Sequence, residues 1–310
     1  MHLLDSVRNT MTCVPFVNEV GAAIAAEYFT EASSNSERKA FVLVTAGPGL
    51  TNTITALASA WVESRELLVI GGQVKSSDLA NGEVRQRGIQ EVDGIAATLP
   101  FTKSRLRITQ PTERDLVLTT IRAGASGRKG PVFLEITLDA QGAPALTEEA
   151  SAQMAGLDDP IQVSQIQVNQ VSSLLKSATR PVILIGSGVS RAGAKNLRSQ
   201  LEHLGSPVML TWNAADRYPE NFELNFGRPN IWGQRYSNVL IQQSDLVIAV
   251  GTRLGMQQTG FSWEQFVPNG KVVQVDIDLS ELMKSHPRKH LTVQADAEMF
   301  LSNLVSAVNG

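Results

Sequence analysis

The sequence predicts an α/β protein with two doubly wound parallel-sheet domains. Short apolar runs such as Phe41–Thr45 are typical of strands that are buried on both faces of a parallel sheet. In both halves of the chain these runs alternate with segments of helical periodicity. Such alternation favours parallel strands that are joined by helices lying on both faces of the sheet.

Length, composition and charge restrict the size class and the partners. At about 150 residues per domain, 310 residues correspond to two domains, and 43% apolar residues allow each domain a core. The net charge of −3 does not indicate the basic surface that binds polyanions, so we predict no nucleic-acid partner. No apolar run reaches the ~18 residues of a membrane span, and residues 1–10 lack the basic-then-apolar order that is typical of a signal peptide. The single cysteine, Cys13, suits a reducing compartment, so we predict a soluble cytoplasmic protein.

The first domain is expected to span 1–145. Residues 1–10 resemble the end of an amphipathic helix, which predicts that a preceding N-terminal strand is missing. A short buried strand is expected at 12–17, and Asn18 can cap the Ala-rich helix that follows. A polar loop is expected at 33–38. Further strands are predicted at 41–45, 67–70, 101–108 and 131–136, and further helices at 51–64, 90–99 and 112–125.

A linker and a second domain follow. Residues 139–163 lose periodicity and are rich in Ala, Gly, Pro and acidic residues, which predicts a linker over 146–165 and a second domain over 166–310. Strands are expected there at 181–185, 207–210, 245–250 and 271–277, and helices at 167–177, 192–204 and 297–308, with a long loop from 211 to about 236.

Glu19 is the first candidate site residue. A glutamate in the first turn of a helix is usually a solvated charge that is favoured by the helix dipole. The surrounding stretch, 14–26, is otherwise uncharged, which favours a partly buried carboxylate, and a buried carboxylate needs either a partner or a raised pKa.

Two glycine-rich turns and a pair of acids are weaker signals. The turn at 46–49 could bind phosphate at a helix N-terminus or could be purely structural, and it matches neither the P-loop nor GxGxxG. The turn at 186–193, with Asp276 and Asp278, leaves an NAD-type dehydrogenase as an alternative. The lack of GxGxxG and of a catalytic His or Lys argues against it. The four histidines lack the spacing of metal ligands, so no metal site is predicted.

Taken together, these stretches resemble thiamine diphosphate-dependent enzymes of the acetolactate synthase type. The motifs of the pyrimidine-binding domain are matched by 18–23, 46–52, 70–73 and 90–93, and those of a Rossmann-like central domain by 180–193, 245–255 and 272–282. Three residues depart from the usual pattern: Asn18 replaces His, Val20 replaces Gln, and Ile89 replaces an aromatic residue.

The resemblance implies roles for individual residues. The Glu19 carboxyl group would hydrogen-bond N1′ of the cofactor's aminopyrimidine, and Gln90 would face the reacting centre, which makes both catalytic. Cofactor-binding residues would be Gly47, Pro48, Asn52 and Gln73. The implied activity is decarboxylation of a 2-keto acid followed by carboligation to a second 2-keto acid or an aldehyde, or a related C–C cleavage.

The resemblance also implies what the chain lacks. The family's third domain binds Mg²⁺ and diphosphate through a Gly-Asp-Gly motif, which does not occur here. We therefore expect an inactive isolated chain, either a fragment or a split subunit, that associates as a homo-oligomer (dimer or tetramer) or with a diphosphate-binding subunit. The alternative is a non-catalytic partner or regulatory module that keeps the family's dimer surface. In acetolactate synthases the central domain binds FAD. Here Arg253 matches an expected position, but Met256-Gln257-Gln258 replaces the family's acidic stretch, so FAD binding is left open.

Overall fold

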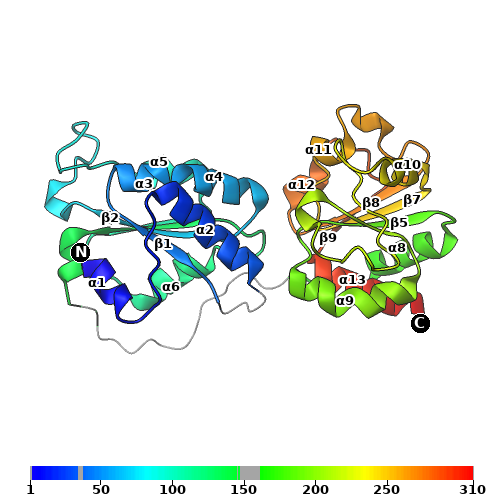
Figure 1. Cartoon of the computed structure of the whole chain (residues 1–310), viewed down its shortest axis with the longest axis horizontal. Coiled ribbons are helices and arrows are strands. Elements are labelled where there is room, and N and C mark those ends of the chain that lie inside the picture. Colours follow the sequence, from blue (N-terminus) through cyan, green and yellow to red (C-terminus); the bar gives the residue numbers. More distant parts are fainter. Residues whose placement is uncertain (1, 34–37, 145, 147–160, 310) are drawn as a thin grey trace. The chain divides into compact units, whose positions relative to one another are not determined.

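The computed structural model describes residues 2–33, 38–144, 146 and 161–309. The chain divides into two compact units, Met1–Asp159 and Pro160–Gly310, which are described separately (Figure 1). Most of the predicted linker 146–165 lies outside the described residues, as do four residues of the loop expected at 33–38.

The first unit is built on a four-stranded parallel sheet in the order β1-β2-β4-β3. In Figure 1, α3, α4 and α5 lie along one side of this sheet and α6 lies along the other. The strands are β1 (Phe41–Val44), β2 (Leu68–Gln73), β3 (Ser104–Ile108) and β4 (Val132–Thr137). The helices are α1 (His2–Arg8), α2 (Glu19–Ala32), α3 (Pro48–Asn52), α4 (Ile54–Glu63), α5 (Gly94–Thr98), α6 (Arg114–Arg122) and α7 (Leu138–Gly142), with 3₁₀ turns η1 (Ser76–Asp78) and η2 (Leu99–Phe101).

Small side chains set the position of α2. The buried Ala23 and Ala26 allow α2 to approach β1 and α4 closely, and Leu57 and Phe133 complete this part of the core. The side-chain oxygen of Asn18 accepts the N–H of Gly21 at 2.7 Å, so the helix begins at Glu19. The cap therefore fixes the place of Glu19 at the first turn.

One predicted element of this unit was wrong, and a second begins later than expected. Residues 12–17 form no strand: the segment is irregular, with Val14 68% exposed and Val17 fully exposed. It pairs with no described strand, and Pro15 has no N–H to donate to one. The helix expected over 90–99 begins only at Gly94, because Gln90 has a left-handed φ of +56° and the Asp93 side chain caps the N–H of Ala96.

The second unit is a five-stranded parallel sheet in the order β6-β5-β7-β8-β9. One core packs against α8, α9 and α13, and a second core on the other face includes Ile241 of α10. The predicted strands are present, but β9 and the short helices α10–α12 were not predicted. The strands are β5 (Pro181–Ile185), β6 (Val208–Leu210), β7 (Leu246–Val250), β8 (Lys271–Asp276) and β9 (Leu291–Gln294). The helices are α8 (Gln165–Ser177), α9 (Arg191–Leu204), α10 (Arg235–Gln243), α11 (Met256–Thr259), α12 (Leu279–Met283) and α13 (Ala297–Asn309), with 3₁₀ turns η3 (Trp212–Ala214) and η4 (Trp263–Gln265).

Candidate cofactor site

The structure brings Glu19 and Asn52 together. Glu19 lies at the start of α2 and Asn52 at the end of α3, and the Asn52 Nδ2 donates to Glu19 Oε2 at 2.9 Å. The Glu19 side chain is only partly buried and Asn52 is exposed, so the pair remains accessible. A glutamate at a helix start and an amide 33 residues later thus form one polar site.

Of the two possibilities for Glu19, the structure shows the partner, Asn52, and not the raised pKa. The hydrogen bond from Asn52, followed by one from its own backbone N–H, holds the pKa of Glu19 below its usual value. The uncharged residues before Glu19 do not bury it, because Phe16 and Val17 are themselves exposed. In this chain the carboxylate is therefore ionised at neutral pH.

The Gly-Pro-Gly turn lies directly against Gln90. Gly47 has φ +63° and ψ −117° and precedes Pro48, the first residue of α3. A Cβ on Gly47 would lie 2.2 Å from the backbone oxygen of Gln90, so only glycine allows this approach. Gln90 itself is exposed. The turn therefore links Gln90 to the start of the short helix that carries Asn52.

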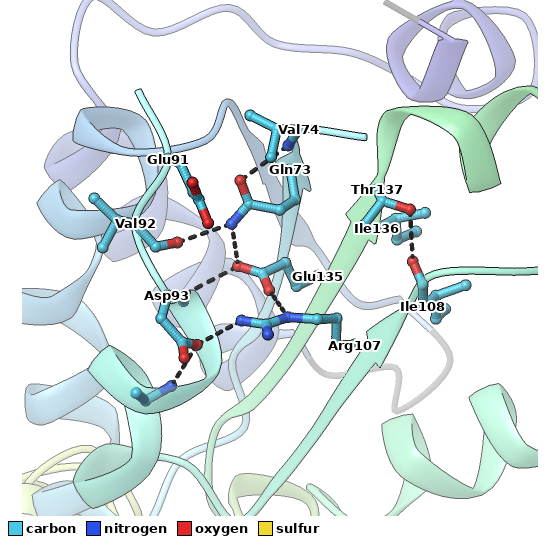
Figure 2. A network of polar contacts seen from close by, with 12 residues as sticks. Gln73, Val74, Glu91, Val92, Asp93, Arg107, Ile108, Glu135, Ile136 and Thr137 are labelled. Carbon is cyan, nitrogen blue, oxygen red and sulfur yellow. Dashed lines mark hydrogen bonds and ion pairs between the residues drawn. The ribbon is translucent and has the colours of Figure 1, made fainter. Parts of the chain in front are cut away.

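Gln73 lies in a buried polar network (Figure 2). It is 5% exposed, and its Nε2 donates to the backbone oxygen of Val92 at 2.8 Å and to Glu135 Oε1 at 3.0 Å. Arg107 from β3 binds both Glu135 and Asp93. Burial raises the pKa of Glu135, while Arg107, Gln73 and the Gly94 N–H lower it in part. Gln73 therefore anchors the segment that follows Gln90.

Glu91 was not singled out from the sequence, although it lies in the Gln-Glu-Val-Asp motif. Its carboxylate is buried and accepts the backbone N–H groups of Ala80, Arg87 and Gly88. The signal available in the sequence was an acid directly after Gln90, at the end of a long polar loop. Sequence reasoning missed it because a carboxylate that binds backbone groups leaves no partner residue to recognise.

In the second unit, other parts of the chain pack closely against the glycine-rich turn at 186–193, where a dinucleotide would bind. A Cβ on Gly186 would lie 2.1 Å from the oxygen of Gly251, so these two turns pack backbone to backbone. At the start of α9, the Glu298 carboxylate accepts the N–H of Ser190 at 2.8 Å. A Cβ on Gly193 would lie within 2.3 Å of that carboxylate. The N-terminus of α9 already holds a negative charge, and it does not fit a second one.

The two acids after β8 also have structural partners. Asp276 Oδ1 accepts the N–H of Asp278 at 2.9 Å, and the Asp278 side chain caps α12 by accepting the N–H of Ser280 at 2.8 Å. These contacts, with the filled start of α9, argue further against a dehydrogenase built on this unit.

The described residues offer neither a metal site nor a membrane-spanning helix. No three His, Cys, Asp or Glu side chains there gather closely enough to hold a metal ion. None of the described helices has the length and apolarity that crossing a bilayer requires.

Comparisons with known proteins agree on both units. Residues 1–97 match the family model described as the N-terminal TPP binding domain of thiamine pyrophosphate enzymes, and residues 168–304 match the model of their central domain. The acetolactate synthase isozyme 1 large subunit of Escherichia coli is 32% identical over 279 residues, which is 87% of this chain and 47% of that protein. An acetolactate synthase large subunit from Corynebacterium glutamicum is 31% identical over 291 residues, 93% of this chain and 45% of that protein.

A third relative matches almost the whole of this chain. The probable acetolactate synthase large subunit of Methanocaldococcus jannaschii is 29% identical over 300 residues, 94% of this chain and 49% of that protein. The chain thus spans about half the length of the curated relatives it matches. With two successive family models covering 1–97 and 168–304, this chain belongs to the thiamine pyrophosphate enzymes and carries their N-terminal and central domains.

Proposed function

We propose that this chain supplies the pyrimidine-binding and central domains of a thiamine diphosphate-dependent enzyme of the acetolactate synthase type. The proposed reaction is decarboxylation of a 2-keto acid and transfer of the remaining fragment to a second carbonyl compound. The observation that carries the proposal is the Glu19–Asn52 pair, an accessible carboxylate within the segment that matches the TPP-binding family model. The similarity to acetolactate synthases supports the substrate class.

The residues of this site fit the pyrimidine end of the cofactor. When bound, thiamine diphosphate supplies the carbon nucleophile and the electron sink for the decarboxylation. Asn52 fixes one oxygen of the Glu19 carboxylate, so the group is oriented to hold a proton shared with a ring nitrogen. Enclosure of Glu19 would remove water from it and raise its pKa, which suits such sharing. Gly47, Pro48 and Gln90 would form the wall beside it.

We also propose that the site is completed by association. The segment before α2 and α2 itself expose large apolar side chains: Phe16, Val17, Ile24, Tyr28 and Phe29 are each at least 40% exposed. Exposed apolar groups on the segment and the helix that carry Glu19 favour a covering protein surface, which we assign to a second copy of the chain. The diphosphate and Mg²⁺ would be held by a further domain, in keeping with the relatives' greater length.

The test is calorimetric titration with thiamine diphosphate and Mg²⁺, with and without a separately expressed diphosphate-binding domain from a relative. We expect binding only in the mixture, turnover of a 2-keto acid there, and loss of turnover in Glu19→Gln. The exposed Glu113→Gln is the matched control, and it should keep full turnover.

Turnover that is indifferent to Glu19→Gln would refute the catalytic role. Binding without turnover in the wild-type mixture would favour the non-catalytic module instead. The visible absorbance of the purified chain decides whether it carries a flavin.

A further inference from the structure

One buried carboxylate sets the path of the loop that carries Gln90. The loop runs from the end of η1 to the start of α5, over residues 79–93. Glu91 Oε1 accepts the N–H of Ala80 at 2.5 Å, and Oε2 accepts the N–H groups of Arg87 at 2.8 Å and Gly88 at 3.0 Å. Glu91 therefore ties the beginning of the loop, eleven residues upstream, to its end.

Glu91 binds the loop backbone and not a cationic side chain. The Arg87 guanidinium pairs with Glu83 at 2.8 Å, while its backbone N–H goes to Glu91. Burial raises the pKa of Glu91, but the three backbone N–H donors, together with the nearby charge of Arg87, hold the pKa below its usual value. An ionised carboxylate is an acceptor only, so it can take all three N–H groups at once.

The other side of Gln90 is anchored as well. The Val92 carbonyl oxygen accepts a hydrogen bond from buried Gln73 (Figure 2). The Gly94 N–H donates to Glu135 Oε1 at 3.1 Å. Between these anchors Gln90 has φ +56°, a conformation that side chain-bearing residues adopt rarely and that the surroundings impose here. Its carbonyl oxygen rests against Gly47.

We propose that Glu91 is the positioning residue for Gln90: by binding three loop N–H groups, it holds Gln90 against Gly47. The role of Gln90 in the reaction rests on the proposed function, whereas its position is a property of this chain. A glutamine at position 91 has the same shape but points an NH₂ group at N–H donors. Glu91→Gln should therefore release the loop without leaving a cavity.

The test uses amide hydrogen exchange and nuclear Overhauser contacts in the full chain. In Glu91→Gln the amides of Ala80, Arg87 and Gly88 should exchange about tenfold faster or more, which corresponds to the loss of one charge-assisted hydrogen bond. The contacts between Gly47 and Gln90 should weaken, while the slowest amides of β2 and β4 stay unchanged. The control Glu83→Gln removes only the exposed pair with the Arg87 side chain and should change none of these signals.

A second variant covers a failure of Glu91→Gln to fold. Glu91→Asp keeps an acceptor-only group on a shorter side chain, so it should give exchange rates between those of the wild type and the open loop. Unchanged loop exchange and an intact Gly47–Gln90 contact in either folded variant would overturn the positioning role.

Turnover in the mixture with a diphosphate-binding domain separates this proposal from the proposed function. Glu91→Gln and Gln90→Ala should lower kcat by similar factors, and the double variant should lose no more than either. Independent, multiplicative losses would overturn the positioning of Gln90. If the wild type and Glu83→Gln give no turnover at all, the proposed function fails, and hydrogen exchange still decides the position of the loop.

Discussion

Gly47→Ala tests whether the Gly-Pro-Gly turn before α3 needs glycine at position 47 because the turn contacts Gln90. A side chain at φ +63° and ψ −117° costs about 1–3 kcal/mol in backbone strain. The added Cβ would also lie 2.2 Å from the Gln90 oxygen, and relieving such overpacking costs about 1–3 kcal/mol. The sum is about 2–6 kcal/mol, a large share of the ~5–15 kcal/mol that stabilises a domain.

Gly82→Ala is the matched control for the backbone term. Gly82 has φ +80° in the same unit, but an added Cβ would meet no atom within 4 Å. We expect this variant to lose only the strain energy, about 1–3 kcal/mol. The difference between the two alanine variants therefore measures the close approach of Gln90 to Gly47.

The assay is hydrogen exchange of the slowest amides of β2 and β4 across a urea series. These amides report the free energy of unfolding of the first unit, and the amides of β5 and β7 provide an internal reference in the second unit. Gly47→Ala should lower the free energy of unfolding of the first unit and leave that of the second unit unchanged. Equal destabilisation by Gly47→Ala and Gly82→Ala would refute the steric argument.

Three further predictions concern other contacts. Asn52→Ala should raise the pKa of Glu19 toward its ordinary value, as followed by carboxyl-carbon NMR, because Asn52 is the largest cause of its lowering; no change would contradict the pairing. Gly193→Ala should destabilise the second unit by about 1–3 kcal/mol in urea unfolding. Adding Glu298→Ala should recover part of that loss, and strict additivity would argue against the clash. The pKa of Glu91 is lowered in the folded protein. The Glu91 carboxylate therefore stabilises the loop fully above the ordinary glutamate pKa near 4.3, and this stabilisation declines as the pH falls through the lower pKa of the folded state. Loop amide exchange, corrected for its intrinsic pH dependence, should therefore rise only as the pH falls below that ordinary value, while the core amides stay slow. A rise at neutral pH would contradict this.

Strands that are buried on both faces were predictable from the sequence. Val182–Ile185 and Leu246–Val250 are continuous apolar runs, and they occupy the centre of the second sheet. β9 was missed because Leu291–Gln294 is a short, mixed-polarity strand that the sheet itself recruits as an edge. The apolar run at 12–17 was misassigned as a buried strand, because local hydrophobicity does not say whether a pairing strand is present.

Part of the candidate site was likewise predictable from the sequence, and part was not. Glu19 and the Gly47 turn could be identified because their positions at a helix start and at a strand-to-helix turn are local features. Other features depend on residues 19 to 62 positions apart: the pairing of Asn52 with Glu19, the ionised state of Glu19 and the anchoring role of Gln73. No local pattern encodes such distances.

By itself, the sequence determined two parallel α/β units, the helix start at Glu19 and the family to which the chain belongs. Each of these follows from periodicity, capping or a run of adjacent motif residues. Only the tertiary structure decided that Glu91 binds the loop backbone, that Glu298 fills the start of α9 and that Gln90 rests on Gly47. The physical reason is that hydrogen bonds and van der Waals contacts act over a few ångströms, between atoms that only the folded chain brings together.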